Sequence, residues 1–349
     1  MTGWFDSLIA ALLAGLLNAV IFAVVSTRLR VAESTFLSRV YVATLLLRAA
    51  MAVGLNAVAG DSSMAGTFWG DSETYDAAGQ SLTRHWEGEG ANPALTRALS
   101  GYGFVYYVGA IYFVFGRNQL LVQLLNVTIG SLTVVVVYAI GRQLFGPDVA
   151  RWSALFMAFF PQMLFWSAGM YKDPAVLLCI ALSMFAVLRL RDAFSPGMAS
   201  LLGLAAVALL SLRFYVFYFV ALAALGALVC GRRGPIVPRL ASYGLVLAVL
   251  VGAFTLAVKR ETLEVQRAFM TLDQMQVTRM DQAMWGKSAY GTEYDVSTPG
   301  GALKALPVGL AYLLFAPFPW AITNEACASD QQGVLRELRS SLRWGFRPL

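Results

Sequence analysis

Charged residues are scarce in this sequence. Only 13% of its 349 residues are Asp, Glu, Lys or Arg, whereas a soluble domain carries about a quarter. Hydrophobic residues make up 58% of the chain, and the mean hydropathy is +0.64. Several apolar runs approach the length of about 20 residues that a helix needs to cross a bilayer. The composition therefore excludes a soluble α/β protein and predicts an all-α, polytopic integral membrane protein.

Cysteine and histidine are scarce as well. Cys179, Cys230 and Cys327 are widely separated and have neither the spacing of a metal site nor that of a disulfide framework. The single histidine, His85, cannot anchor a His-rich metal site, and a lone loop histidine is usually solvated. We therefore expect no cofactor and no metal site. The acidic cluster described below is nevertheless compatible with a divalent metal ion. The net charge of +6 does not indicate a nucleic-acid partner, because membrane proteins concentrate Lys and Arg in cytoplasmic loops.

Nine segments qualify as transmembrane helices by their length and apolar composition. They are residues 8–27, 41–59, 118–140, 152–169, 174–190, 198–212, 214–230, 240–258 and 305–322. The first segment lacks a basic n-region and a small-residue cleavage site, so we interpret it as a retained helix rather than a signal peptide. The predicted fold is a helical bundle with about nine transmembrane helices.

Arginines distinguish the loops that connect these segments. Ten arginines and three acids lie in four short loops: 28–39, 141–151, 189–197 and 231–239. The positive-inside rule places these loops in the cytoplasm. Cytoplasmic and outward loops alternate along the chain only if residues 101–116 do not cross the membrane. The tyrosines of this stretch predict a helix in the outer headgroup layer. Two longer loops, 60–117 and 259–304, then face outward.

The same assignment gives the domain organisation. We predict that residues 1–322 form one transmembrane domain in a bacterial plasma membrane, followed by a basic cytoplasmic tail, 323–349. Within the second outward loop, hydrophobic side chains recur at roughly helical spacing at Leu263, Phe269, Leu272, Met275 and Met280. An amphipathic helix on the membrane surface and a packing helix of a small external subdomain both fit this pattern.

Three carboxylates stand within six residues in "TFWGDSETYDAAGQSL": Asp71, Glu73 and Asp76. If Ser72 to Leu82 is helical, Asp71 caps its N-terminus, and Glu73 and Asp76 share one face. A capped, solvated surface helix explains the spacing, and so does a catalytic cluster. As a metal site the cluster is incomplete, because calcium takes six to eight oxygen ligands.

Two further stretches place charge at the outward ends of spans. In "MYKDPAVLLC", Asp173 and Pro174 are typical of a helix start, which leaves Lys172 unexplained. In "SLRFYVFY", Arg213 lies at the turn between two apolar spans, where its natural partner is an anionic headgroup or a phosphate, with snorkelling as the alternative. Arg48 lies within the second span and requires a polar partner on another helix.

Together these residues predict one outward face with a carboxylate cluster and two cations. A general base beside phosphate-binding cations is what transfer from a lipid-linked phosphate donor needs. The base takes a proton from an acceptor hydroxyl, and the cations stabilise the charge that develops on the leaving phosphate.

The sequence resembles the polyprenyl-phosphate-dependent GT-C glycosyltransferases, which include family 39, the aminoarabinose transferases and the protein O-mannosyltransferases. Their acidic "DE-x-x-Y…A" motif is similar to "GDSETYDAAGQSL", in which Asp71, Tyr75 and Ala78 match, Ser72 replaces the second acid, and Glu73 comes one place late. The similarity continues through "GRQLFG", the acid–proline pair at Asp173 and the later "APFPW". It covers roughly residues 41–320.

The resemblance implies an inverting transfer of a sugar from a polyprenyl-phosphate donor to an acceptor on a lipid, glycan or protein. It implies Asp71 as the base, and Lys172 and Arg213 as candidates for the donor phosphate. Our catalytic candidates are Asp71, Glu73 and Asp173, and our substrate-binding candidates are Tyr75, Asp76, Lys172 and Arg213. Relatives usually continue with more helices after the segment similar to "APFPW", so the chain is expected to be C-terminally short.

Three other functions remain open. A transporter or flippase of lipid-linked saccharides would place ionisable residues near the bilayer midplane, as Arg48 is placed. A polymerase or ligase would use a pyrophosphate-linked donor. A non-catalytic short homologue would lack activity altogether.

Overall fold

A computed structural model describes residues 4–28, 31–60, 71–90, 92, 102–192, 195–229, 236–257, 271–286 and 293–315, and every regular element in these ranges is a helix. The chain divides into two compact units, Met1–Thr262 and Leu263–Leu349. This division falls within the second predicted outward loop. The predicted tail 323–349, the "APFPW" segment, and Leu263 and Phe269 lie outside the described residues.

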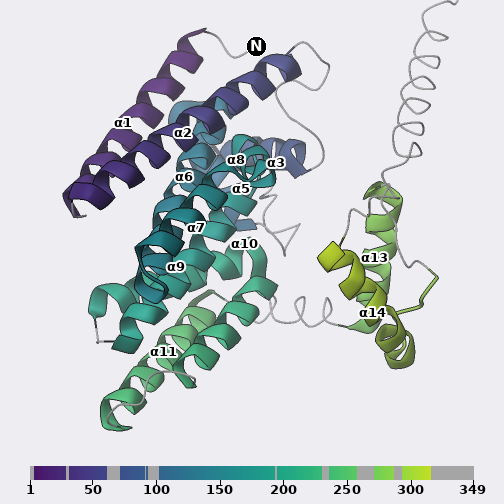
Figure 1. Cartoon of the computed structure of the whole chain (residues 1–349). Coiled ribbons are helices and arrows are strands. Elements are labelled where there is room, and N and C mark those ends of the chain that lie inside the picture. Colours follow the sequence, from purple (N-terminus) through teal and green to yellow (C-terminus); the bar gives the residue numbers. More distant parts are fainter. Residues whose placement is uncertain are drawn as a thin grey trace, which may run out of the picture. The chain divides into compact units, whose positions relative to one another are not determined.

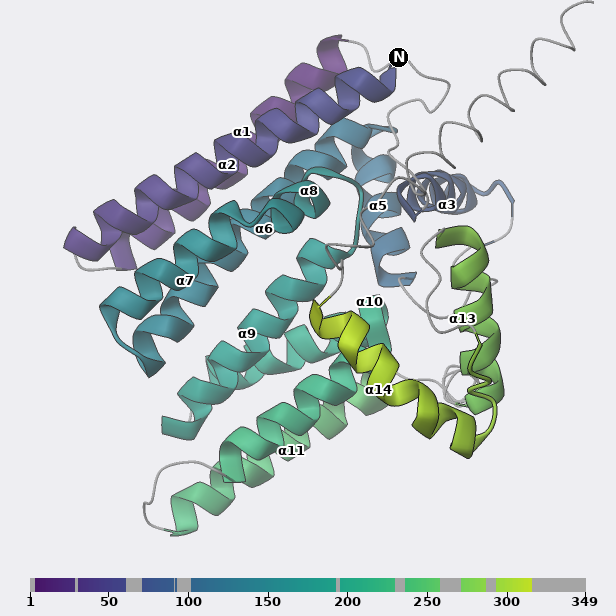
Figure 2. The same cartoon turned by 45° about the vertical axis from the view of Figure 1, so that its right-hand side comes forward.

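The first unit contains ten described helices, shown in Figures 1 and 2. They are α1 (Trp4–Arg28), α2 (Val31–Gly60), α3 (Asp71–Trp86), α5 (Tyr102–Phe115), α6 (Gln119–Leu144), α7 (Pro147–Phe159), α8 (Pro161–Ala168), α9 (Asp173–Asp192), α10 (Pro196–Val229) and α11 (Ile236–Ala257). The second unit contains α13 (Leu272–Gly286) and α14 (Pro299–Phe315). Met275 and Met280 of the predicted amphipathic helix lie exposed on α13.

Four helical segments among the described residues are long and apolar enough to cross a membrane: Glu33–Asn56, Gln119–Leu144, Asp173–Asp192 and Pro196–Ala227. Shorter apolar helices occupy Ser7–Ala23, Tyr102–Phe115 and Gly244–Thr255. The helical membrane class is therefore confirmed, while the number of nine spans stays a prediction. Helix α5 has 14 residues, which correspond to about 21 Å and are short for a bilayer core of about 30 Å.

Helix α6 is the centre of the first unit, because it contacts α1, α2, α7, α8 and α9. Thr128 and Gln123 among its buried polar side chains bond to α1 and α2, whereas Ser131 and Thr133 donate to carbonyls of α6 itself. Asn18 of α1 donates to Thr128 Oγ1 of α6 at 2.8 Å, and Tyr41 of α2 donates to Asn18 Oδ1 at 2.6 Å. Asn18 therefore links α1 to α6 and α2 to α1 within the core.

The predicted span 152–169 is not one helix. Phe160 has extended backbone angles, φ −64° and ψ 120°, and separates α7 from α8. The physical reason is Pro161, which has no N–H to donate to the carbonyl of Met157 four residues earlier and so breaks the helix. Apolar composition alone does not reveal this break.

Arg48 supplies the missing donor. Its Nη2 donates to Met157 O at 3.1 Å, its Nη1 to Met163 O at 3.1 Å and to Ser167 Oγ at 2.6 Å, and its Nε to Thr44 Oγ1 at 3.0 Å. Only 1% of the residue is exposed. A Cβ atom on Gly130 would lie 2.6 Å from Arg48 Nη1, so the glycine makes room for the guanidinium. The partners of Arg48 are therefore hydroxyls and backbone carbonyls around the helix break.

Helix α10 consists of two segments that meet at Arg213, whose φ of −151° and ψ of 88° are not helical. The first segment starts just after the end of α9 and finishes where Arg213 contacts Asp173, at the start of α9. Residues of the second segment then line a cavity together with α9. The chain therefore reverses at Arg213, which is the boundary predicted between the spans 198–212 and 214–230.

Candidate functional site

Helices α3 and α5 pack closely and form the first wall of the site. A Cβ atom on Gly79 of α3 would lie 2.5 Å from Val108 Cγ1 of α5, so only glycine permits this approach. Thr83 of α3 also donates to the backbone carbonyl of Gly109 at 3.2 Å. The predicted helix in the acidic stretch is confirmed, and it starts at Asp71.

The three carboxylates of α3 have different surroundings. Asp76 is 4% exposed and accepts a hydrogen bond from Tyr112 at 2.6 Å. Its Oδ1 also accepts from Arg117 Nε at 3.3 Å, and its Oδ2 from Arg117 Nη2 at 2.5 Å. Asp71 and Glu73 are exposed. Asp76 therefore clamps α3 to the end of α5 and does not share an exposed face with Glu73.

Lys172 approaches α3 from the segment between α8 and α9. The residue is 6% exposed, and its Nζ lies 5.6 Å from the centroid of the Tyr75 ring, within the range of a cation–π interaction. Burial and the charge of Arg213 lower the pKa of Lys172, while Asp71 and Asp173 oppose that shift. The same two carboxylates act on Tyr75, whose pKa is raised mainly by burial. Lys172 and Tyr75 therefore both lie within electrostatic range of Asp71 and Asp173.

Arg213 is held at the reversal of α10 by two side chains. Its Nη2 lies 2.7 Å from Asp173 Oδ1, and its Nη1 donates to the hydroxyl of Tyr215 at 3.2 Å. Both members of the ion pair are about one-third exposed, and an exposed pair of this kind contributes only about 0.2–1 kcal/mol to stability. The charged partner of Arg213 within the described residues is thus a carboxylate, and both side chains of the pair remain partly exposed.

Five of the seven predicted site residues come together at one end of the first unit: Asp71, Tyr75, Lys172, Asp173 and Arg213. Asp76 points into the α3–α5 contact, and Glu73 is not among the charges that act on Lys172 or Tyr75. The sequence interpretation missed Tyr171, which directly precedes Lys172, and Tyr215, which is two residues beyond Arg213. It also missed Asn126, whose only signal was a polar residue within an apolar helix.

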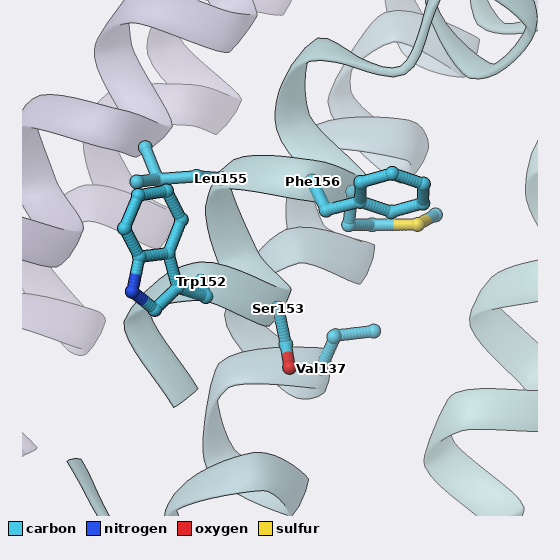
Figure 3. A pocket seen from close by; sticks show the side chains of 6 residues that line it. Val137, Trp152, Ser153, Leu155 and Phe156 are labelled. Carbon is cyan, nitrogen blue, oxygen red and sulfur yellow. The ribbon is translucent and has the colours of Figure 1, made fainter. Parts of the chain in front are cut away.

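An apolar cavity lies between α9 and the second segment of α10, with a volume of about 470 Å³. Val216 and Ile180 line it nearest the Arg213–Asp173 pair, and Leu188, Ala227 and Leu144 line it toward the opposite end of these helices. A second hollow, of about 590 Å³, is lined by residues of α6 and α7, and Figure 3 shows their side chains. Trp152, Phe156 and Val137 line it, and none of the predicted site residues does, so it is not the candidate site.

No three His, Cys, Asp or Glu side chains within the described ranges are grouped closely enough to hold a metal ion. Among the carboxylates of α3, Asp76 is paired with Arg117. Independence from metal stays a prediction.

Comparison with known proteins relates these elements to a protein family. No curated protein and no solved structure matches the chain. Residues 102–257, which carry Lys172, Asp173 and Arg213 but not Asp71, match the model of the dolichyl-phosphate-mannose-protein mannosyltransferase family. This match confirms the predicted resemblance to the GT-C glycosyltransferases and indicates a membrane glycosyltransferase of that type.

Proposed function

We propose that the protein transfers a sugar from a polyprenyl-phosphate carrier to an acceptor hydroxyl at the outer face of a bacterial plasma membrane, with inversion at the anomeric carbon. The observation that carries the proposal is the gathering of Asp71, Lys172, Asp173 and Arg213 around Tyr75. This set contains an accessible carboxylate and two cations, and it lies in a chain that matches a lipid-phosphate-dependent family.

Asp71 is the general base of the proposed reaction. It is the first residue of α3 and its side chain is exposed, so an acceptor hydroxyl can reach it. Asp173 is committed to Arg213, and Asp76 to Arg117. Asp71 is therefore the carboxylate best placed to take the proton of an acceptor hydroxyl.

Lys172 and Arg213 bind the donor phosphate. As the acceptor oxygen bonds to the anomeric carbon, the bond from that carbon to the phosphate oxygen breaks, and its electron pair stays on the phosphate. Two fixed cations stabilise this developing charge. Asp173 orients Arg213 through the 2.7 Å contact, and Tyr75 orients Lys172 with its ring.

The lipid part of the donor occupies the cavity between α9 and α10. The cavity starts near Val216, three residues beyond Arg213, and its lining is almost entirely aliphatic and aromatic. A phosphate at Lys172 and Arg213 would therefore have an apolar route beside it for its isoprenoid chain.

The test measures release of polyprenyl phosphate from a panel of undecaprenyl-phosphate sugars, with crude envelope extract as acceptor. Loss of a general base lowers the rate by about 10²–10⁴-fold, so the Asp71→Asn protein should release almost none. Glu87→Gln, which removes an exposed acid just beyond α3, is the matched control. Glu73→Gln, run alongside, decides whether one or two carboxylates act. Undiminished turnover by Asp71→Asn would overturn the base assignment, and the absence of release by folded wild type would overturn the donor class.

A further inference from the structure

The segment Gly169–Lys172 joins α8 to α9 and carries the buried cation of the proposed site. It lies between the two helices, so helical hydrogen bonds do not fix its backbone before Lys172, whose carbonyl accepts from the N–H of Val176 in α9. Gly169 is extended, with φ −104° and ψ −178°. Another element must therefore hold the segment for Lys172 to point reproducibly at Tyr75.

Asn126 supplies this support from α6. The residue is fully buried, and its Nδ2 donates to the carbonyl of Gly169 at 2.9 Å and to the carbonyl of Tyr171 at 3.0 Å. Both partners are acceptors, so the amide cannot be reversed without placing its oxygen against two other oxygens. One NH₂ group thus bridges two carbonyls on either side of Met170.

The bridge fixes the residue that precedes Lys172, and α9 fixes the residue itself. The carbonyl of Lys172 accepts a hydrogen bond from the backbone N–H of Val176 at 3.0 Å. The Tyr171 ring folds back over Gly169, where a Cβ atom would lie 2.4 Å from the ring, and it meets Trp166 with centroids 4.6 Å apart. The backbone at Lys172 is therefore held from both sides.

The Asn126 amide forms its hydrogen bonds through the NH₂ group and not through the oxygen. Its Oδ1 is buried and has no hydrogen-bond partner within the part of the chain that the structure describes. A buried acceptor without a donor is unfavourable, so an amide that served only to fill space on α6 would be better replaced by an aliphatic residue. The contribution of Asn126 lies in its two donors, both of which go to the segment that carries Lys172.

We propose that Asn126 is a positioning residue for the donor phosphate: it holds Gly169–Lys172 so that the Lys172 ammonium stays buried against Tyr75. The effect on catalysis rests on the function proposed above, whereas the position of Lys172 does not. The two can therefore be measured separately.

The first measurement is reductive methylation of lysines with formaldehyde and cyanoborohydride, followed by mass spectrometry. The chain has four lysines, Lys172, Lys259, Lys287 and Lys304, and the exposed Lys304 provides an internal reference. In the wild-type protein Lys172 should be protected. In Asn126→Leu its modification relative to Lys304 should rise by about tenfold or more. The isosteric Asn126→Asp, which loses the NH₂ donors without changing shape, should give the same result.

A matched control removes a different buried amide from the same helix. Gln123 is one turn earlier on α6 and accepts from Asn56 Nδ2 at 3.2 Å, and neither hydrogen bond of the 169–172 bridge involves it. Gln123→Leu should therefore leave Lys172 protected. Thermal unfolding of all variants in detergent shows that each is folded under the labelling conditions.

The second measurement is steady-state transfer with an undecaprenyl-phosphate sugar. A displacement of about 1 Å can lower rates by about 10²-fold. Because Lys172 is proposed both to bind the donor phosphate and to stabilise the charge that develops on it, its displacement should raise KM for the donor and also lower kcat. Exposure of Lys172 with a raised donor KM supports the proposal. Exposure of Lys172 in a protein without transferase activity supports the positioning and overturns the function. Protection of Lys172 in both folded Asn126 variants overturns the positioning.

Discussion

The hydrogen bond from Arg48 to the carbonyl of Met157 predicts a specific coupling between two positions that are far apart in the sequence. Pro161 removes the N–H that would serve this carbonyl in a continuous helix, and Arg48 Nη2 donates to it at 3.1 Å. We expect Arg48→Leu to destabilise the protein less when Pro161 is also replaced by Ala, because residue 161 then has an N–H to donate.

The magnitude follows from the groups that Arg48→Leu leaves without a donor. The carbonyl of Met163 still accepts from Ser167 at 2.8 Å, and Thr44 still donates to Ala158 O at 3.1 Å. The carbonyl of Met157 loses the donor that replaced the missing N–H. An unsatisfied buried polar group costs about 1–3 kcal/mol, so the coupling free energy between the two substitutions should be about 1–3 kcal/mol.

The assay is a double-mutant cycle on the free energy of unfolding, measured in detergent micelles by denaturant titration and far-UV circular dichroism. Pro147→Ala is the matched control. Pro147 is the first residue of α7, where its missing N–H is not needed inside the helix. Its substitution should be additive with Arg48→Leu to within about 0.5 kcal/mol.

Additivity of Arg48→Leu with Pro161→Ala, within the same limit, would refute the reasoning. It would show that the Met157 carbonyl does not depend on Arg48.

Three further predictions concern the site. Arg213→Ala should raise KM for the donor without unfolding the protein, because its exposed ion pair with Asp173 contributes little stability, and an equal loss of thermal stability and activity would contradict this. Burial lowers the pKa of Lys172 below its ordinary value of 10.5, so the fraction that is charged falls, and donor KM rises, as pH increases through a range below 10.5. Protonation of Lys172 is more favourable in the unfolded chain, so the contribution of Lys172 to the free energy of unfolding increases as pH rises through that range. Lys172→Arg should abolish the rise in donor KM at alkaline pH, and a rise that persists would exclude Lys172 as its source. Dialysis against EDTA should leave the rate of sugar transfer unchanged, and loss of activity that Mg²⁺ or Mn²⁺ restores would contradict the expected independence from metal.

The sequence predicted those features that local chemistry determines. Asp71 as the start of a helix and Asp173–Pro174 as another start follow from the side chains themselves. The reversal at Arg213 follows from two apolar runs that together exceed one bilayer crossing. Membrane orientation, by contrast, rests on arginine placement alone.

Other features depend on tertiary contacts that spacing does not determine. Glu73 and Asp76 are three residues apart, but only the packing of α5 decides that Asp76 is buried against Arg117 and Tyr112. Arg48 and Asn126 each bind backbone carbonyls, and backbone acceptors have no signature in a sequence. The broken span at Pro161 was missed because an apolar run reads the same with or without a helix break.

Four charged side chains lie around Tyr75: Asp71, Asp173, Lys172 and Arg213. Their formal charges sum to zero before a donor binds. In the proposed reaction the donor phosphodiester brings one negative charge, and the product phosphomonoester carries up to two at neutral pH. The proton captured by Asp71 compensates for this difference, so the total charge of the occupied site does not change during transfer. When Asp71 later loses that proton to water, the site gains a negative charge that repels the lipid phosphate. Turnover is then linked to proton release, and the departure of the carrier should be slower in acid than at neutral pH.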